Sequence, residues 1–297
     1  TGVGVPAKES GARVAVVGGG PAGIACAVRL LEKGHRVTLV EQGKRLGGTP
    51  DSIIPGDRYR RAENEVEAIL KPALETGRLD VRFNTSLGRE VKLGELRTRY
   101  DAVCLAAGLS ESWSLGRAEG VVDALGFLHR VKSGELDRVP QTVAVLGGGN
   151  TAMDAAVTAR ELGARDVYLV YRRSFGEMPA WPGERDRFME SGGHCLILTQ
   201  PLGYETDDAD KLRGLRIART QLGEPDESGR RRPEVIPGTE SVLPVGLVVE
   251  ALGQGVSAGL KDALEGVALN ARGLVELPRQ GSFATGLEKV FAAGDLV

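Results

Sequence analysis

Cysteine is scarce in this 297-residue chain, which contains three and no C-x-x-C pair. Cys26, Cys104 and Cys195 are too few and too widely spaced for the four thiolates that an iron–sulfur cluster normally takes, or for a local redox disulfide. Each of them lies in an apolar stretch of sequence. We therefore predict plain buried thiols in a protein of the reducing cytoplasm.

The chain also lacks an excess of charge and any long apolar run. Its 38 basic and 40 acidic residues give a formal net charge of −2, so no nucleic-acid partner and no anionic membrane surface is expected. No apolar run reaches the ~18 residues needed to span a bilayer, and no secretory signal opens the chain. These absences predict a cytoplasmic protein with no membrane contact.

Glycine, in contrast, is abundant, with 42 residues or about twice the usual share. Many of these glycines stand where an apolar run meets a helical pattern, which indicates tight turns from strand to helix. The first case is a strand at Arg13–Val17, a G-G-G-P-A-G turn at 18–23, a helix over 21–33 and a strand at Arg36–Val40. Strand, turn, helix and strand together form one βαβ unit.

The same arrangement returns 129 positions later (147 minus 18). Thr142–Leu146 is predicted as a strand, G-G-G-N-T-A at 147–152 opens a helix that ends near residue 162, and 167–171 is the next strand. One such copy is weak evidence, but two copies in the right context are specific. The sequence therefore predicts an α/β fold with two Rossmann-like βαβ nucleotide-binding domains.

The residues of the first turn fit a pyrophosphate. Gly18 permits the bend out of the strand, Gly20 lets the backbone approach the phosphates, and Gly23 lets the helix pack closely on the strand. Glu41, 23 residues after Gly18, suits ribose hydroxyls and would repel a 2′-phosphate. This site is thus predicted to take FAD or NAD, and the alternative is a purely structural glycine turn.

The second turn has Gly147, Gly149 and Ala152 in the three small-residue positions. Arg172 and Arg173 stand where an acidic residue would follow the second strand, and guanidinium groups suit a 2′-phosphate. The sequence therefore predicts a preference for NADPH over NADH at this site. The alternative is a solvated basic pair at the end of a strand.

No side chain presents a pattern for catalysis or metal binding. The three histidines lie apart, the carboxylates are scattered, and zinc-ligand spacing is missing. Trp181 is expected to pack against the fold, and 223–232 is expected to be an exposed hairpin tip or loop. With two dinucleotide sites, hydride transfer between the cofactors themselves is expected, while the protein positions them.

At this point the chain resembles a known group, the flavoproteins of the NADPH-dependent glutamate synthase small (beta) chain family, related to the N-terminal half of dihydropyrimidine dehydrogenase. Besides the two turns, the match rests on R-L-G-G at 45–48, I-P-G-D-R at 54–58, Y-D-A-V-C-L-A-A-G at 100–108, Y-R-R-S-F-G-E-M-P-A at 171–180, E-A-L-G-Q at 250–254 and V-F-A-A-G-D at 290–295.

This resemblance implies FAD in the first fold and NADPH in the second, with the NADPH domain (119–253) inserted in the FAD domain (1–118 and 254–297). The implied FAD contacts are Gly18, Gly20, Pro21, Ala22, Gly23, Glu41, Gln42, Leu46, Gly48, Arg58, Ala107, Gly108, Gly294 and Asp295. The implied NADPH contacts are Gly147, Gly149, Asn150, Thr151, Ala152, Arg172, Arg173, Ala251, Leu252 and Gly253.

The chain also departs from this family pattern. The printed sequence contains neither the cysteine-rich domain that holds iron–sulfur clusters in the family nor the helix that follows Gly294 and Asp295 there, whose loss would weaken the FAD site. We therefore expect either that this sequence is a fragment of a longer chain or that FAD occupancy is reduced. We expect an oxidoreductase module that moves electrons between NADPH and FAD and on to an iron–sulfur or flavin partner, such as a larger synthase or dehydrogenase subunit. The alternatives are a stand-alone NAD(P)H–flavin reductase with a small acceptor, or a non-catalytic fragment with an empty FAD site.

Overall fold

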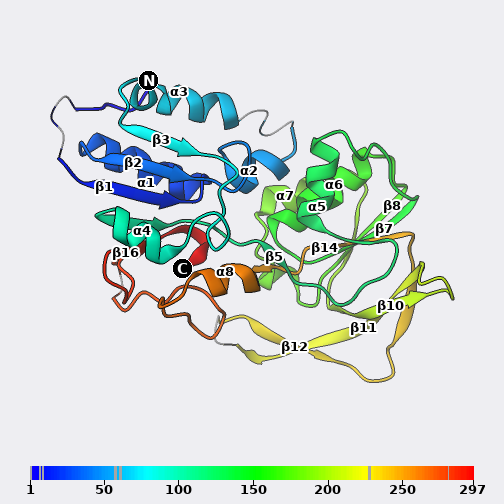
Figure 1. Cartoon of the computed structure of the whole chain (residues 1–297). Helices are drawn as coiled ribbons and strands as arrows, with labels where there is room; N and C mark the ends of the chain where they lie inside the picture. The colour runs from blue at the N-terminus through cyan, green and yellow to red at the C-terminus, as the bar shows by residue number, and fades with distance from the viewer. Residues whose placement is uncertain are drawn as a thin grey trace. The chain divides into compact units, whose positions relative to one another are not determined.

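The structure is a computed structural model that describes residues 2–6, 8, 10–56, 59, 62–226, 229–279 and 281–297. The chain forms two compact units, of which unit 1 comprises Thr1–Glu111 and Gln254–Val297 and unit 2 comprises Ser112–Gly253 (Figure 1). Unit 2 is therefore inserted in unit 1. The division follows Glu111, whereas the sequence analysis placed the first boundary after residue 118.

Unit 1 is built on a five-stranded parallel sheet with the strand order β16-β4-β1-β2-β3. Its strands are β1 (Arg13–Val17), β2 (Arg36–Val40), β3 (Leu79–Arg82), β4 (Ala102–Leu105) and β16 (Val290–Ala292). Its helices are α1 (Pro21–Glu32), α2 (Gly48–Ile53), α3 (Ala62–Glu75), α4 (Leu93–Arg99), α8 (Ala258–Ala263) and the 3-10 turn η2 (Gly294–Leu296).

Apolar side chains cover both faces of this sheet, because every residue of β1 and β2 after the first is buried. On one face Val16 and Leu39 pack with Leu31 of α1 and Leu70 of α3. On the other face, Ala15 of β1 lies in a second apolar cluster, which includes residues of α4 and of the segment that follows α8. The sheet thus holds β1 at the centre of a closed core, with the turn at its carboxyl end.

Unit 2 has its own five-stranded parallel sheet, in the order β6-β14-β7-β8-β9, and an antiparallel sheet in which β11 pairs with β10, β12 and β13. The parallel strands are β6 (Val121–Asp123), β7 (Thr142–Leu146), β8 (Asp166–Val170), β9 (His194–Leu196) and β14 (Leu247–Glu250). The antiparallel strands are β10 (Thr199–Thr206), β11 (Leu212–Pro225), β12 (Arg231–Val235) and β13 (Ser241–Pro244).

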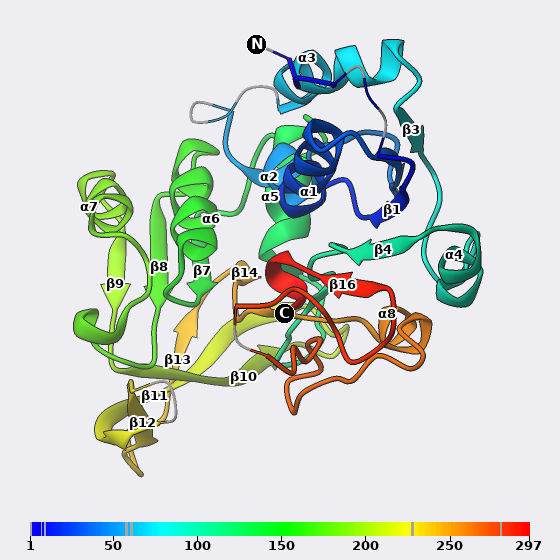
Figure 2. The ribbon, with the colours of Figure 1, turned by 90° about the vertical axis from the view of Figure 1, so that its left-hand side faces the viewer.

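The helices of unit 2 are α5 (Ala124–Lys132), α6 (Asn150–Glu161), η1 (Phe175–Glu177) and α7 (Pro182–Glu190). Figure 2 shows β7, β8 and β9 in succession, with α6 and α7 beside them. Leu212 and Leu215 of β11 pack against Leu146 and Val248, so the antiparallel sheet closes the core of the parallel one. The short strands β5 (Glu111–Ser112) and β15 (Gln254–Gly255) pair with each other.

Several predicted elements occur where the sequence placed them. The strands Arg13–Val17, Arg36–Val40 and Thr142–Leu146 have the predicted bounds, and the polar stretch at 223–232 includes the tip of the β11–β12 hairpin. Within the described ranges, no helix is long and apolar enough to cross a membrane.

Candidate dinucleotide sites

The first glycine turn has room for no side chain at two of its positions. Gly18 has φ +108°, and a Cβ built there would lie 2.3 Å from the carbonyl oxygen of Ala106. A Cβ on Gly23 would lie 1.8 Å from the carbonyl oxygen of Gly18. The predicted roles of these two glycines, a sharp bend and close helix packing, therefore have a direct steric basis.

Among the described residues, no side chain caps the N-terminus of α1. Gly20, the N-cap residue, has no side chain to form a cap bond, and the first turn of the helix contains no acidic residue. Pro21 at the first helical position has no N–H to satisfy. The remaining N–H groups and the positive end of the helix dipole are consequently available to an anion.

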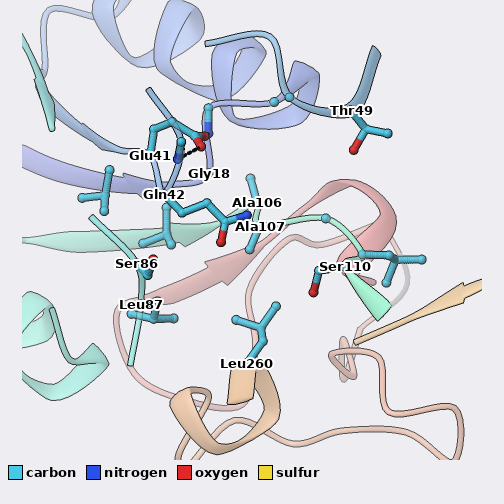
Figure 3. Close-up of a pocket in the computed structure, with 18 of the residues that line it drawn as sticks. Gly18, Glu41, Gln42, Thr49, Ser86, Leu87, Ala106, Ala107, Ser110 and Leu260 are labelled. Atoms are coloured by element: carbon cyan, nitrogen blue, oxygen red, sulfur yellow. Dashed lines mark hydrogen bonds between the residues drawn. The ribbon is translucent and has the colours of Figure 1, made fainter. Parts of the chain in front are cut away.

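Glu41 joins the two turns that border this site. Its side chain is buried, its Oε2 accepts a hydrogen bond from the Gly19 N–H at 2.7 Å, and its Oε1 accepts one from the Gly43 N–H at 2.5 Å; Figure 3 shows Glu41 beside the Gly18 turn. Each carboxylate oxygen accepts more than one hydrogen bond. Glu41 can therefore hold the backbone and still accept a ribose hydroxyl.

A cavity of about 950 Å³ opens in front of the first turn and lies wholly in unit 1 (Figure 3). Most residues that were predicted to contact FAD line it, namely Gly18, Gly20, Pro21, Ala22, Glu41, Gln42, Leu46, Gly48, Ala107, Gly108, Gly294 and Asp295. Gly23 lies behind the turn, against Gly18, and Arg58 lies outside the described residues. The predicted residues come from four separate segments of the sequence, and in the structure they line the same cavity.

The fit of this cavity to FAD rests on its size and its backbone. A volume of this order suits a large cofactor. Gly48, with φ +65°, brings the start of α2 so close that a Cβ there would lie 2.8 Å from the Gly20 Cα. Both glycines therefore expose bare backbone to the cavity, as close approach to a pyrophosphate requires.

Sequence reasoning missed another part of the cavity wall. Ser86 and Leu87 line it just beyond β3, Ser110 lines it beyond β4, and Leu260 lines it from α8 (Figure 3). The residues beyond β3 could have been found, because ligands of parallel sheets bind at the carboxyl ends of the strands. Leu260 carries no local signal, since only the return of the chain from unit 2 brings it there.

The second glycine turn repeats the first one in unit 2. Gly147 has φ +136°, and a Cβ there would lie 2.4 Å from the carbonyl oxygen of Ala251. The Ala251 N–H donates to the Leu146 carbonyl at 2.8 Å, because β14 and β7 are neighbours. Ala152 is fully buried, as the packing position requires. The structure thus brings the predicted segments 147–152 and 251–253 together.

The N-terminus of α6 is also without a side-chain cap. Gly149 is its N-cap residue, and a Cβ there would meet no atom within 4 Å. Asn150 is exposed, and its Oδ1 accepts the N–H of Trp181 at 3.0 Å, while Thr151 is half-buried. This open backbone at the start of a helix fits the diphosphate of a nicotinamide nucleotide.

The two arginines after β8 have different environments. Arg172 is exposed. The Arg173 side chain is only 7% exposed and pairs with Asp226, with 2.6 Å between Nη2 and Oδ2. From the sequence we expected the two arginines to be equivalent. In the structure Arg172 is exposed, whereas the guanidinium group of Arg173 is buried.

A buried carboxylate near the second turn was also missed. Glu250 is 4% exposed, accepts the Leu115 N–H at 2.7 Å and accepts a hydrogen bond from the Tyr204 hydroxyl. Burial, followed by the bond to Glu250, raises the pKa of Tyr204, so the phenol stays protonated and keeps donating. Glu250 therefore fixes the end of β14, directly before Ala251.

Two expectations about single residues need correction. Cys104 is buried, but Cys26 and Cys195 are only partly so. Cys26 packs against the cluster that contains Cys104, and the neighbouring Cys26 thiol, together with burial, raises the pKa of Cys104. This contact could not be predicted from the sequence, because Cys26 in α1 and Cys104 in β4 lie far apart along the chain. Trp181 does not pack into the fold, since its side chain is 71% exposed.

Comparison with known proteins shows which family the chain belongs to. The model of the pyridine nucleotide-disulphide oxidoreductases matches residues 12–297. The chain belongs to this family. The family consists of oxidoreductases that use NAD(P)H, and membership in it confirms the prediction of a nicotinamide-nucleotide-dependent flavoprotein enzyme.

Relatives confirm the predicted resemblance to the glutamate synthase small chain. The small chain of NADPH glutamate synthase from Escherichia coli is 34% identical over 307 residues, covering 98% of this chain and 64% of that one. The beta subunit of an NADP(+)-dependent formate dehydrogenase from Moorella thermoacetica is 38% identical over 300 residues, covering 98% of this chain and 41% of that one. This chain thus spans less than two thirds of these relatives.

A solved structure agrees with the fold. Mycobacterium tuberculosis FprA in complex with NADPH superimposes with a TM-score of 0.75 at 20% identity, over 96% of this chain and 79% of that one. At this identity the likeness shows the fold alone. It confirms the predicted α/β class with two dinucleotide-binding domains, one inserted in the other.

Proposed function

We propose that unit 1 holds FAD, that unit 2 holds NADPH, and that the chain is the flavoprotein part of an enzyme that moves electrons between NADPH and an iron–sulfur or flavin partner. The observation that carries this proposal is the repeated site. In each unit a glycine turn at the carboxyl end of a central strand opens a helix, and in the part of the chain that the structure describes no side chain caps its N-terminus.

In unit 1 the large cavity and Glu41 favour FAD. The α1 N-terminus and the bare backbone of Gly20 and Gly48 would hold the diphosphate, and the Glu41 carboxylate would accept the adenosine ribose hydroxyls. An additional phosphate on that ribose would meet the negative charge of Glu41. This repulsion supports FAD, whose ribose is not phosphorylated, in unit 1.

In unit 2 the charge at the corresponding place is reversed. The exposed Arg172 follows β8 and would pair with a 2′-phosphate, while Gly149 and the α6 N-terminus would hold the diphosphate. The names of the two relatives also refer to NADPH or NADP(+), and FprA was solved with NADPH. We therefore assign NADPH to unit 2.

When both nucleotides are bound, FAD supplies the chemistry, which is hydride exchange with NADPH and release of electrons one at a time. The residues of this chain bind and orient. Because the two relatives are named as a beta subunit and a small chain, we further propose that larger partner subunits receive or deliver the electrons.

A matched pair of substitutions tests the assignment of one cofactor to each unit. Gly20 and Gly149 are both N-cap residues with extended backbone, at φ −81° and −92°. A Cβ at Gly20 would meet nothing closer than 3.9 Å, and one at Gly149 nothing within 4 Å, so Gly20→Ala and Gly149→Ala should both fold normally. In the loaded protein each methyl would crowd a diphosphate, so each variant should lose about tenfold or more in affinity for one nucleotide.

Titration calorimetry with FAD and with NADPH gives the readout. Gly20→Ala should weaken FAD and leave NADPH within about twofold, and Gly149→Ala should do the reverse. A variant that weakens both nucleotides equally, or a swap of the two, contradicts the assignment. Steady turnover of the isolated chain with oxygen or a quinone would instead favour a stand-alone reductase, and a chain that never binds FAD would favour a non-catalytic module.

A further inference from the structure

Unit 1 has a second cavity, of about 400 Å³, which shares no lining residue with the cofactor cavity. We call it the arginine cavity, because five arginines line it, namely Arg13, Arg36, Arg78, Arg82 and Arg99. The formal net charge of the whole chain is only −2. The arginine cavity therefore concentrates positive charge in a protein that has no overall excess of it.

The arginine cavity lies on the face of the sheet that α4 covers in part. Ala15 of β1 packs there with Leu96 of α4. Because side chains alternate along a strand, Arg13 lies on the same face as Ala15, and so does Arg36, the partner of Arg13 in β2. In the part of the chain that the structure describes, no residue of β2 or β3 belongs to the apolar cluster of this face. Polar side chains beside α4 take their place.

Strands β2 and β3 continue the face with these polar side chains. Residues two apart along a strand share a face, so Arg36, Thr38 and Val40 lie together, with Asp80 opposite Thr38 and Arg82 opposite Val40. Asp80 Oδ2 lies 3.0 Å from Arg82 Nε. That bond engages Nε alone, and among the described residues neither Nη group of Arg82 has a hydrogen-bond partner. Arg82 thus keeps donors for a ligand.

Two further arginines extend this set of donors. Arg13 begins β1, Arg99 ends α4, and both are exposed. The hydrogen bonds of Arg13 run through its main chain, since its N–H donates to Oδ2 of Asp101 at 2.7 Å and its carbonyl accepts the Asp101 N–H at 2.9 Å. Within the described ranges, the guanidinium groups of Arg13 and Arg99 have no hydrogen-bond or ion-pair partner.

The remaining two arginines contribute charge rather than donors. Arg78 is buried, and its guanidinium group donates to two main-chain carbonyls, at 3.2 and 3.4 Å. Arg36 also has contacts of its own. The only carboxylate among the described residues that line the cavity is that of Asp80, and Asp101 lies next to it. The arginines outnumber both carboxylates together, so the cavity attracts anions.

We propose that the arginine cavity binds a small molecule that carries two or more phosphate groups. Guanidinium groups pair with phosphate through two parallel hydrogen bonds, and Arg13, Arg82 and Arg99 have donors for such pairs. The volume of about 400 Å³ is that of a small-molecule site. Several positive charges around one cavity favour an anion of high charge over a single phosphate.

Inorganic pyrophosphate tests the proposal in the full chain. The chain is first saturated with FAD and NADPH, so that pyrophosphate cannot occupy the proposed diphosphate sites at α1 and α6. Titration calorimetry at constant ionic strength should then show one site per chain, with binding at least about tenfold tighter than that of inorganic phosphate. The proposal is overturned if pyrophosphate does not bind, or binds no more tightly than inorganic phosphate.

Arg99→Gln and Arg97→Gln form a matched pair, because each removes one positive charge from the last turn of α4. Arg99 lines the cavity, whereas Arg97 does not line it and donates to the Glu288 carbonyl at 3.2 Å. Arg99→Gln should weaken pyrophosphate binding about tenfold, and Arg97→Gln should change it less than about twofold. Equal losses would show that only the overall charge matters, and would overturn the proposal.

Arg13→Gln gives a second, independent measurement. The main-chain bonds of Arg13 remain in this variant, so it should fold normally. Pyrophosphate should bind about tenfold more weakly, while the Kd values for FAD and NADPH stay within about twofold, because Arg13 lies outside the cofactor cavity. An equal loss for pyrophosphate and for one nucleotide would assign the anion to a dinucleotide site and overturn the proposal. Unchanged pyrophosphate binding in both Arg13→Gln and Arg99→Gln would also overturn it.

Discussion

Gly23→Ala should be the most damaging glycine-to-alanine substitution in unit 1, since no other glycine of that unit would bring a Cβ so close to a neighbouring atom. The new Cβ would lie 1.8 Å from the carbonyl oxygen of Gly18, whereas ordinary contact begins near 3.4 Å. Helix α1 would have to withdraw from the turn by about 1.6 Å (3.4 minus 1.8), because the opposing atom belongs to the backbone and cannot rotate away. Overpacking of cores costs about 1–3 kcal/mol, and we expect at least ~3 kcal/mol here.

Thermal unfolding and FAD binding together measure this effect. A loss of about 3 kcal/mol should lower the Tm of a domain of this size by about 6–12 °C. FAD affinity should fall in parallel, because the withdrawal of α1 moves the N–H groups that would face the diphosphate.

Gly94→Ala provides the control, since Gly94 also lies in a helix, α4, and a Cβ there would meet nothing within 4 Å. The free energy of unfolding of that variant should rise by about 0.5–1 kcal/mol. If Gly23→Ala unfolds at the wild-type temperature with wild-type FAD affinity, the steric account of the turn is refuted.

Three further predictions concern polar groups that are buried, in Glu250 and Glu41, or half-buried, in Tyr204. Glu250→Ala should lower the free energy of unfolding, measured with urea, by about 3 kcal/mol, and Glu250→Gln should lower it by about half of that, because the amide oxygen still accepts one hydrogen bond. Equal losses in the two variants would contradict this prediction. Glu41→Gln should weaken FAD about tenfold, since an amide NH₂ must then face the N–H of Gly19 or Gly43. Because the pKa of Tyr204 is raised in the folded state, its contribution to stability is complete below the pKa of about 10 in the unfolded chain and is lost as the pH rises through the pKa of the folded protein. Tyr204→Phe should therefore lose less stability than the wild type as the pH rises in the alkaline range. An unchanged slope of stability against pH would contradict this prediction.

The parts of the fold that the sequence predicts well are those with local causes. The strands before both glycine turns are apolar, the turns require glycine, and Glu41 follows directly after β2, so the bounds of the strands and the positions of these residues were predictable. The antiparallel sheet of unit 2 was not predicted as a sheet. Its strands β10 to β13 mix buried and exposed residues around bulges, and their pairing depends on contacts that form only in the folded chain.

The site shows the same limit at the level of side chains. The glycines were predictable because backbone geometry dictates them, but Arg172 and Arg173 look equivalent as sequence. Only the hairpin that brings Asp226 against Arg173 separates their environments. The contact between Cys26 and Cys104 and the burial of Glu250 are likewise tertiary, because the partners lie far apart along the chain.

The most direct test of the central claim is an anaerobic absorbance titration of the chain loaded with FAD. We expect a flavin band at about 450 nm that is bleached by about one equivalent of NADPH, with far more NADH required for the same change. A chain that shows no flavin band after incubation with FAD, or a band that NADPH leaves unchanged, would contradict the claim that these two units bring FAD and NADPH together.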